Sequence, residues 1–180
     1  MNITASQLYK NISEYDNYVS HKVIKKAYDL SKKAHTNQFR GTGEEYFTHP
    51  LAVADYLVKM KLDSATIITA LLHDVVEDSE ITIENIKDEF GIEISKLVDG
   101  VTKLSKLDLK FGFAQAENFR KLLLASSDDI RVLLVKLADR LHNIRTINGI
   151  KNDKKRTKIC FETLEIFAPL AERLGINAIQ

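Results

Sequence analysis

The sequence predicts an all-α fold, and three observations support this prediction. Apolar residues recur at spacings of three and four along most of the chain, which is the period of a helix with one buried face. Only two prolines and seven glycines occur among 180 residues, so long helices are permitted. No segment alternates apolar and polar residues cleanly enough to predict a strand. Several expected helices are apolar enough to need neighbours on more than one side, as in a multi-helix bundle.

The first half of the chain is expected to hold three helices and a loop. An amphipathic helix covers residues 23–35, with lysines on the face opposite its apolar residues. Residues 38–49 contain two glycines and are predicted to form a loop. Pro50 suits the first turn of a second helix, which ends near Lys61. The third helix carries residues 67–78, whose alanine and leucine residues favour helix.

The second half is expected to be helical as well. Five helices are predicted, over residues 82–91, 92–106, 114–125, 130–147 and 154–174. Loops are predicted at residues 111–113, 126–129 and 149–153. We expect an interruption near Gly100, a bend at Pro169 and a helix stop at Gly175.

Capping residues mark two of these helix starts. Asp63 or Ser64 can accept a hydrogen bond from the free backbone N–H groups at the start of the helix over residues 67–78. Thr82, followed three residues later by Asn85, can do the same for the next helix.

Composition limits the classes of function. A chain of this length suits one domain, residues 1–180, and the formal net charge of +1 gives no electrostatic reason to expect nucleic acid or an acidic membrane as partner. Cys160 is the only cysteine, which excludes an intramolecular disulfide and a cysteine-based metal site and suits a reducing compartment. No apolar stretch is long enough to span a membrane, and the N-terminal residues lack a signal pattern. We therefore expect a cytoplasmic protein.

Four ionisable residues lie close together in an otherwise apolar stretch, IITALLHDVVED. On a helix, Glu77 and Asp78 lie one turn beyond His73 and Asp74. Burying such groups without partners would cost several kcal/mol each, so a bound cation is the simplest explanation. The alternative is an ordinary hydrogen-bonded core histidine, with the acidic residues facing water at a helix end.

Two other segments offer matching ligands. Asp139 follows a similar apolar run, and Asn143 lies four residues later on the same helix face. The alternative for Asp139 is a buried ion pair with Arg140 or Arg145. His49 ends the glycine-containing loop, where its side chain can point inward from the start of a helix, although alone it would be unremarkable.

Together, these residues predict a divalent metal site with two nitrogen and two oxygen ligands, His49, His73, Asp74 and Asp139. Such a set suits Mn²⁺, Fe²⁺, Co²⁺ or Zn²⁺ better than Ca²⁺ or Mg²⁺. A metal-bound water ionises near neutral pH and becomes a nucleophile. Glu77 and Asp78 would then be placed to orient that water or to move its proton.

Five ordered motifs carry a family resemblance: EYFTHP, HDVVEDSE, LVDGVTKL, FRKLLLA and DIRVLLVKLADRLHNIRT. They closely resemble the hydrolase half of the RelA/SpoT family, whose members make and degrade guanosine tetra- and pentaphosphate. That half belongs to the HD superfamily of metal-dependent phosphohydrolases. The resemblance covers residues 22–175 and includes ETLEIFAPLAERLGI near the end.

The resemblance implies roles for the residues that match the family's motifs. It implies one Mn²⁺ per site, bound by the four ligands named above, with Glu77 and Asp78 activating water. It implies that Arg40 stacks on the guanine base, a contact suited to a planar guanidinium. The nucleotide pocket would also include Thr42, Asn143 and Thr146. Arg156 matches a basic residue that reaches a phosphate, although the run KNDKKRTK also reads as a solvated helix face.

Two positions depart from the family's usual pattern. Gly41 stands where members often carry a lysine, so one charge that attracts phosphate is missing. Glu45 stands where they often carry a proline, which would loosen the loop. Neither departure affects the metal ligands.

The predicted function is metal-dependent removal of the 3′-pyrophosphate from guanosine tetra- or pentaphosphate, giving GDP or GTP. One alternative is the same chemistry on another nucleotide, such as NADPH or a deoxynucleotide. Another is a module that binds the alarmone without cutting it. No synthetase or regulatory domain is expected, and the last helix is expected to end in mid-course at Gln180, which favours a fragment over a stand-alone hydrolase. The sequence predicts no oligomeric state.

Overall fold

The computed structural model describes residues 3–107, 109 and 115–176. Over these residues the chain is helical, with one isolated bridge between Phe39 and Glu45 in the loop before the third helix. The predicted all-α fold is thereby confirmed. The loop predicted at residues 111–113, the first residue of the helix predicted at 114–125, and Gln180 lie outside the described residues.

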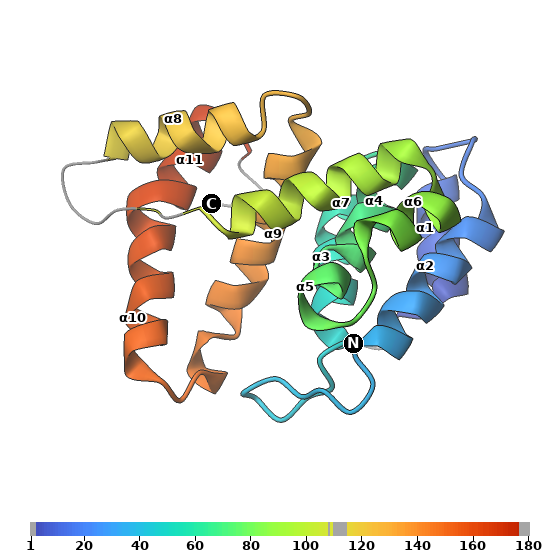
Figure 1. Cartoon of the computed structure of the whole chain (residues 1–180), viewed down its shortest axis with the longest axis horizontal. Coiled ribbons are helices and arrows are strands. Elements are labelled where there is room, and N and C mark those ends of the chain that lie inside the picture. Colours follow the sequence, from blue (N-terminus) through green and yellow to red (C-terminus); the bar gives the residue numbers. More distant parts are fainter. Residues whose placement is uncertain (1–2, 108, 110–114, 177–180) are drawn as a thin grey trace.

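Figure 1 shows the helices in chain order from blue to red. They are α1 (Ala5–Ser13), α2 (His21–Ala34), α3 (Thr48–Lys59), α4 (Ser64–Leu72), α5 (Val75–Asp78), α6 (Ile83–Phe90), α7 (Ile92–Ser105), α8 (Gln115–Ala125), α9 (Arg131–Arg145), α10 (Asp153–Glu162) and α11 (Ala168–Arg173). A short 3₁₀ helix, Ile147–Gly149, follows α9, and a π-helix, Thr163–Phe167, joins α10 to α11. None of the helices in the described ranges combines the length and the apolar character that a membrane crossing requires.

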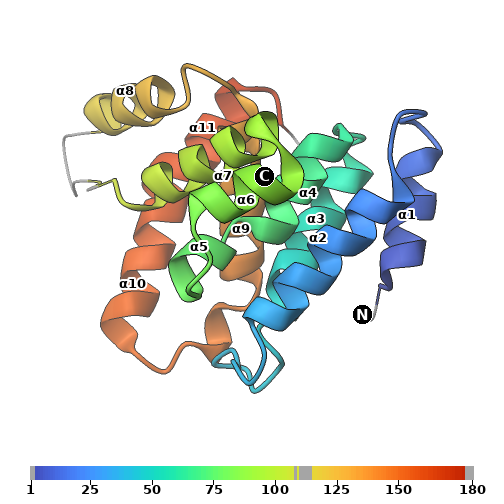
Figure 2. The same cartoon turned by 45° about the vertical axis from the view of Figure 1, so that its right-hand side comes forward.

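Four helices form the centre of the molecule. α3 packs against α4 and α9, and α7 packs against both α4 and α9. Each contributes fully buried aliphatic side chains, for example Leu57, Leu71, Val98 and Leu133. α1 and α2 cover this core on one side, whereas α8, α10 and α11 lie on the other (Figures 1 and 2). These four helices therefore bury apolar side chains against more than one neighbour, as the sequence predicted for several helices.

Helix starts follow the predicted capping chemistry. Asp63, one of the two predicted caps of α4, accepts hydrogen bonds from the backbone N–H of Thr66 at 2.7 Å and from its hydroxyl at 2.8 Å. Thr82 and Asn85 form a reciprocal capping box at the start of α6. The chain then turns at Gly91, whose φ of 90° lies in the region that favours glycine.

The structure corrects the prediction of one helix over residues 67–78. α4 ends at Leu72, and α5 begins at Val75, so His73 and Asp74 lie at the junction. The His73 ring contacts the carbonyl oxygen of Ala70 at 2.7 Å, so this carbonyl at the end of α4 accepts a hydrogen bond from a side chain. Asp74 has φ −93° and ψ −10°, which is outside ideal helix geometry.

Three further differences concern the ends and the middle of the chain. α1 was not predicted. Gly100 does not interrupt α7; a Cβ there would lie 2.7 Å from Val132 Cγ2, so glycine permits the close approach of α7 and α9. Near Pro169, where a bend was predicted, the Ala168 N–H bonds to the Thr163 carbonyl five residues earlier and forms a π-turn.

Candidate metal centre

Three side chains bring potential ligand atoms within 4.8 Å of one another. They are His49, in the first turn of α3, and His73 and Asp74, at the junction of α4 and α5. Asp139, from α9, does not share this 4.8 Å group, although its Oδ1 lies 3.2 Å from His49 Nε2. The packing of three separate segments therefore brings three of the four predicted ligands into one group and places Asp139 beside His49.

His73 is oriented by the backbone of its own helix. Its Nδ1 lies 2.7 Å from the carbonyl oxygen of Ala70, and because a carbonyl can only accept, Nδ1 carries the proton. Nε2 therefore presents a lone pair. It lies 3.2 Å from Asp74 Oδ1, but it has no hydrogen-bond partner among the described residues and is fully buried. A buried acceptor without a donor is costly, and a metal ion would satisfy it.

The two ring nitrogens of His49 face different partners, and Nδ1 contacts a residue of α9. His49 Nδ1 lies 2.8 Å from His142 Nδ1, across 93 positions of sequence. The His49 Nε2 atom faces the carboxylates, 3.5 Å from Asp74 Oδ2 and 3.2 Å from Asp139 Oδ1. Both rings are buried. His142 was not predicted as part of the site.

Asp139 is held by two neighbours on α9. Lys136 Nζ lies 2.6 Å from Asp139 Oδ2, and Asn143 Nδ2 donates to Oδ1 at 2.6 Å. The ammonium group of Lys136 also donates to Ser105 Oγ on α7 at 3.0 Å. The predicted alternative was a buried ion pair of Asp139 with Arg140 or Arg145. Neither pair occurs among the described contacts, and Arg140 pairs instead with Glu162 at 2.8 Å.

The electrostatics favour the protonation states that metal ligands need. Burial lowers the pKa of His49, which favours the neutral imidazole. Burial alone would raise the pKa of Asp74, but the neighbouring His73 and His49 outweigh it and lower that pKa. Burial likewise opposes ionisation of Asp139, yet Lys136 and His49 hold its pKa well below the ordinary value. A neutral imidazole at His49 and ionised carboxylates at Asp74 and Asp139 are the forms that bind a metal.

The two predicted water-activating acids have different surroundings. Glu77 lines the cavity beside the metal centre, and burial, together with the charge of Asp74, raises its pKa. Both residues are exposed, but Asp78 does not line this cavity, and its backbone carbonyl accepts a hydrogen bond from Gln38 Nε2 at 3.0 Å. Tyr46 also lines the cavity and donates to Asp74 Oδ2 at 2.9 Å. Glu77 is therefore better placed than Asp78 to act on a water at the centre.

A cavity of about 350 Å³ opens beside these ligands, a size suited to a small ligand. Arg40 lines it and donates from Nη2 to Asn143 Oδ1 at 2.9 Å and to Thr146 Oγ1 at 3.1 Å. These contacts fix one edge of the guanidinium. Three of the predicted nucleotide-binding residues thus contact one another, although the loop and α9 are distant in sequence.

The loop is also held by a close approach between two glycines. A Cβ on Gly41 would lie 2.0 Å from the carbonyl oxygen of Gly149, and a Cβ on Gly149 would lie 2.4 Å from Thr42 Cγ2. The absence of a side chain at position 41, which departs from the family pattern, therefore has a local steric reason. Thr42 itself is exposed, is not among the lining residues, and bonds to Glu44 at 3.3 Å.

The basic residues at the start of α10 are arranged differently from expectation. Arg156 pairs with Asp153 at 2.7 Å and is not among the residues that line the cavity, so its contact with a phosphate stays a prediction. Lys155 lines the cavity instead. Its ammonium group has no ion pair or hydrogen bond with any residue that the structure describes. Sequence reasoning missed Lys155 because three basic residues stand in a row there.

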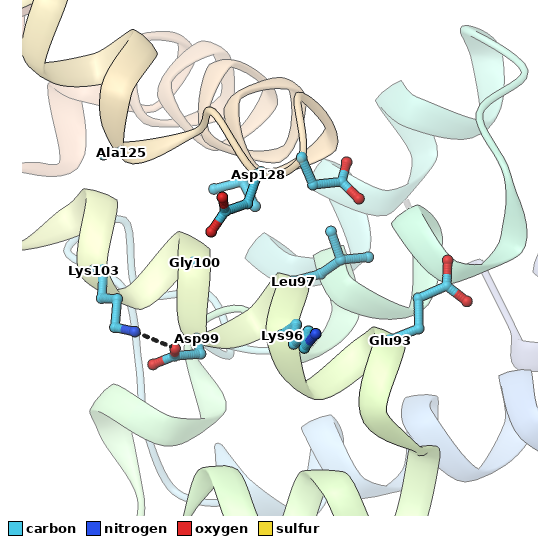
Figure 3. A pocket seen from close by; sticks show the side chains of 10 residues that line it. Glu93, Lys96, Leu97, Asp99, Gly100, Lys103, Ala125 and Asp128 are labelled. Atoms are coloured by element: carbon cyan, nitrogen blue, oxygen red, sulfur yellow. Dashed lines mark hydrogen bonds and ion pairs between the residues drawn. The ribbon is translucent and has the colours of Figure 1, made fainter.

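A second cavity, of about 340 Å³, lies between α7 and the turn before α9 (Figure 3). Its acidic groups include Asp99, which pairs with Lys103, and Glu93, which pairs with Arg131. Among the described residues, no histidine lines it. This cavity therefore lacks the mixed nitrogen and oxygen ligands of the first.

Comparisons with known proteins match this chain to one domain family and to several relatives. A family model described as "HD domain" matches residues 27–177. A Brucella melitensis protein, "GTP pyrophosphokinase rsh", is 52% identical over 172 residues, which are 95% of this chain and 23% of that protein. The Escherichia coli protein "Bifunctional (p)ppGpp synthase/hydrolase SpoT" is 51% identical over 88% of this chain and 23% of its own length.

A Haemophilus influenzae relative, "Guanosine-3′,5′-bis(diphosphate) 3′-pyrophosphohydrolase", is 51% identical over 84% of this chain and 22% of its own length. The chain thus spans less than a quarter of the length of these relatives. A solved structure described as "A metazoan ortholog of SpoT hydrolyzes ppGpp and plays a role in starvation responses" superposes with a TM-score of 0.61. That match has 27% identity and covers 78% of this chain and 80% of the other.

Proposed function

Because this chain belongs to the HD domain family, we propose that it is a metal-dependent phosphohydrolase that removes the 3′-pyrophosphate from guanosine tetra- and pentaphosphate. The products are GDP or GTP and pyrophosphate. The resemblance to RelA/SpoT proteins, predicted from the motifs, is confirmed by relatives at 51–52% identity. Their names supply the substrate class that we propose here.

The observation that carries the proposal is the unsatisfied Nε2 of His73. It is buried, the Ala70 carbonyl holds the proton on the other ring nitrogen, and His73 groups with His49 and Asp74, whose ligand atoms lie within 4.8 Å of one another. His49, His73, Asp74 and Asp139 would hold the ion, and Mn²⁺ fits this mixed nitrogen and oxygen set. When bound, such an ion polarises a phosphoryl oxygen and lowers the pKa of a coordinated water.

Glu77 is the proposed proton acceptor for the attacking water. Its carboxylate lines the cavity, and its raised pKa brings it closer to the working range of a general base. Asp78 is proposed to assist through Tyr46: burial raises the pKa of the Tyr46 hydroxyl, and the charges of Asp74 and Asp78 raise it further. That hydroxyl stays protonated and holds Asp74 in place through its hydrogen bond.

The proposed nucleotide site is built around Arg40. Its guanidinium edge is fixed by Asn143 and Thr146, and such a planar cation can stack on guanine. Thr42 is proposed to contact the nucleotide from the loop. Lys155 is the cavity-lining cation that is free of partners among the described residues, so it is proposed to meet a phosphate.

Turnover of guanosine tetraphosphate with and without Mn²⁺, with the products identified by chromatography, tests this function. We expect GDP and pyrophosphate only when the metal is present, and no turnover by His73→Ala. Arg40→Ala should mainly raise KM, since a stacking contact is present in the ground state and the transition state alike.

Two outcomes would overturn the proposal. Faster Mn²⁺-dependent turnover of NADPH or a deoxynucleotide would assign a different substrate. Tight binding of guanosine tetraphosphate without turnover, in metal-loaded protein, would indicate a binding module.

A further inference from the structure

Two buried imidazoles contact each other directly behind the proposed metal centre. His49 Nδ1 and His142 Nδ1 are 2.8 Å apart, and both rings are buried. At this distance the nitrogens form a hydrogen bond, so one carries a proton and the other offers a lone pair. The contact joins α3 to α9, the helix that also carries Asp139, so the two helices are linked at the site.

Only one of the two proton arrangements is compatible with His49 as a metal ligand. A neutral imidazole has a single N–H. Coordination through Nε2 needs the lone pair of that nitrogen, so the proton must lie on Nδ1 and point at His142. The opposite arrangement would place the proton on Nε2, where it faces Asp139 Oδ1 at 3.2 Å.

We propose that His142 is a positioning residue for the metal site. Its Nδ1 accepts the hydrogen bond from His49 Nδ1–H, and this fixes the ring orientation and the tautomer in which His49 Nε2 can bind a divalent cation. The inference rests on the proposed function, because it takes His49 as a ligand. Partners of this kind orient a ligating histidine, and their loss costs about 10–100-fold in metal affinity.

His73 provides an internal comparison. Its Nδ1 donates to the Ala70 carbonyl, which can only accept, and no side-chain substitution removes that partner. His142 can either donate or accept. The tautomer of His49 therefore depends on a side chain, whereas the tautomer of His73 is set by the backbone.

The test compares two substitutions at one position. His142→Leu removes the acceptor, whereas His142→Asn keeps one, because an amide oxygen can occupy about the place of the imidazole Nδ1. We expect the Mn²⁺ dissociation constant, measured by calorimetry, to rise about 10–100-fold in His142→Leu and to stay near the wild-type value in His142→Asn. Circular dichroism of both variants establishes that they are folded.

Two results would overturn the inference. An unchanged Mn²⁺ dissociation constant in folded His142→Leu would show that the acceptor is dispensable. An equal loss in both variants would show that only the packing of the ring matters.

A second measurement uses the wild type alone and holds even where a variant does not fold. Nitrogen-15 NMR of protein loaded with diamagnetic Zn²⁺ should show the proton on His49 Nδ1 and none on His142 Nδ1. A proton on His142 Nδ1 in that state would refute the proposal, as would a wild type that binds neither metal.

None of these measurements involves hydrolysis, so the two proposals fail separately. Suppose that the wild type binds Mn²⁺, that the His142 variants change its affinity as expected, and that guanosine tetraphosphate is not hydrolysed. This result overturns the proposed function alone. A wild type that hydrolyses guanosine tetraphosphate, with the proton on His142 Nδ1, overturns this inference alone.

Discussion

The side-chain amide of Asn143 joins Arg40 to Asp139. It accepts a hydrogen bond from Arg40 Nη2 at 2.9 Å and donates one to Asp139 Oδ1 at 2.6 Å. One residue on α9 thus connects the proposed base-stacking arginine with a proposed metal ligand. Both groups depend on the position of the same amide.

This relationship predicts that Asn143→Ala weakens two functions together. We expect the Mn²⁺ dissociation constant to rise about 10-fold, because Asp139 loses an orienting donor, and KM for guanosine tetraphosphate to rise as well. Thr146→Val is the matched control, since Thr146 contacts Arg40 but bears no hydrogen bond to Asp139 among the described contacts. Calorimetry and steady-state kinetics separate the two effects. A change in KM alone for Asn143→Ala would contradict the bridging role.

Metal removal should lower the thermal stability of the wild type. An ion present at about 100 times its dissociation constant stabilises the native state by about 2.7 kcal/mol, which is about 5–10 °C in Tm for a domain of this size. His73→Ala should show no such dependence on Mn²⁺ or EDTA, because the buried Nε2 ligand is gone. Differential scanning calorimetry measures both. An equal Mn²⁺-induced rise in the variant would argue against His73 as a ligand.

Adjacent basic residues on α10 should behave differently. Lys155→Ala should raise KM about 10-fold with kcat nearly unchanged, since it removes a charged contact with a phosphate that does not react. Arg156→Ala should leave KM near the wild-type value, because Arg156 pairs with Asp153. Initial-rate kinetics on both proteins measure the contrast. The reverse order of effects would favour Arg156 as the phosphate contact and restore the expectation drawn from the family resemblance.

Stability should depend on pH through Asp129 at the start of α9. A hydrogen bond from the Arg131 side chain is the main cause that lowers the pKa of Asp129, against the effect of burial. Because the folded-state pKa lies below the ordinary 3.8, this contact stabilises the protein above that value and is lost as the pH falls through the folded-state pKa.

Asp129→Asn should therefore reduce the free energy of unfolding at pH 7 by about 1 kcal/mol, and the difference from wild type should shrink below about pH 4. Urea unfolding at several pH values measures this. Asp128→Asn is the neighbouring control, since Asp128 forms no ion pair with a described residue. A difference that persists unchanged at low pH would exclude the ionised Asp129 as its source.

Local sequence signals predicted most of the helices. The all-α fold, the cap at Asp63 and the capping box of Thr82 follow from short-range patterns, and the structure agrees with each. The break after Leu72 was missed because the apolar period continues through His73 and gives no sign that the ring bonds back to Ala70. α1 was missed because its short amphipathic pattern has only two buried residues.

Sequence alone therefore determined the fold class and the chemical types of the proposed ligands, since both depend on local periodicity and on residue identity. Only the tertiary structure decided which residues surround them. The His142 contact with His49 and the choice of Lys155 over Arg156 as a cavity residue depend on how α3, α9 and α10 pack. Such contacts join segments tens of residues apart, and no short-range pattern records the distance between two side chains that meet only after the helices have packed.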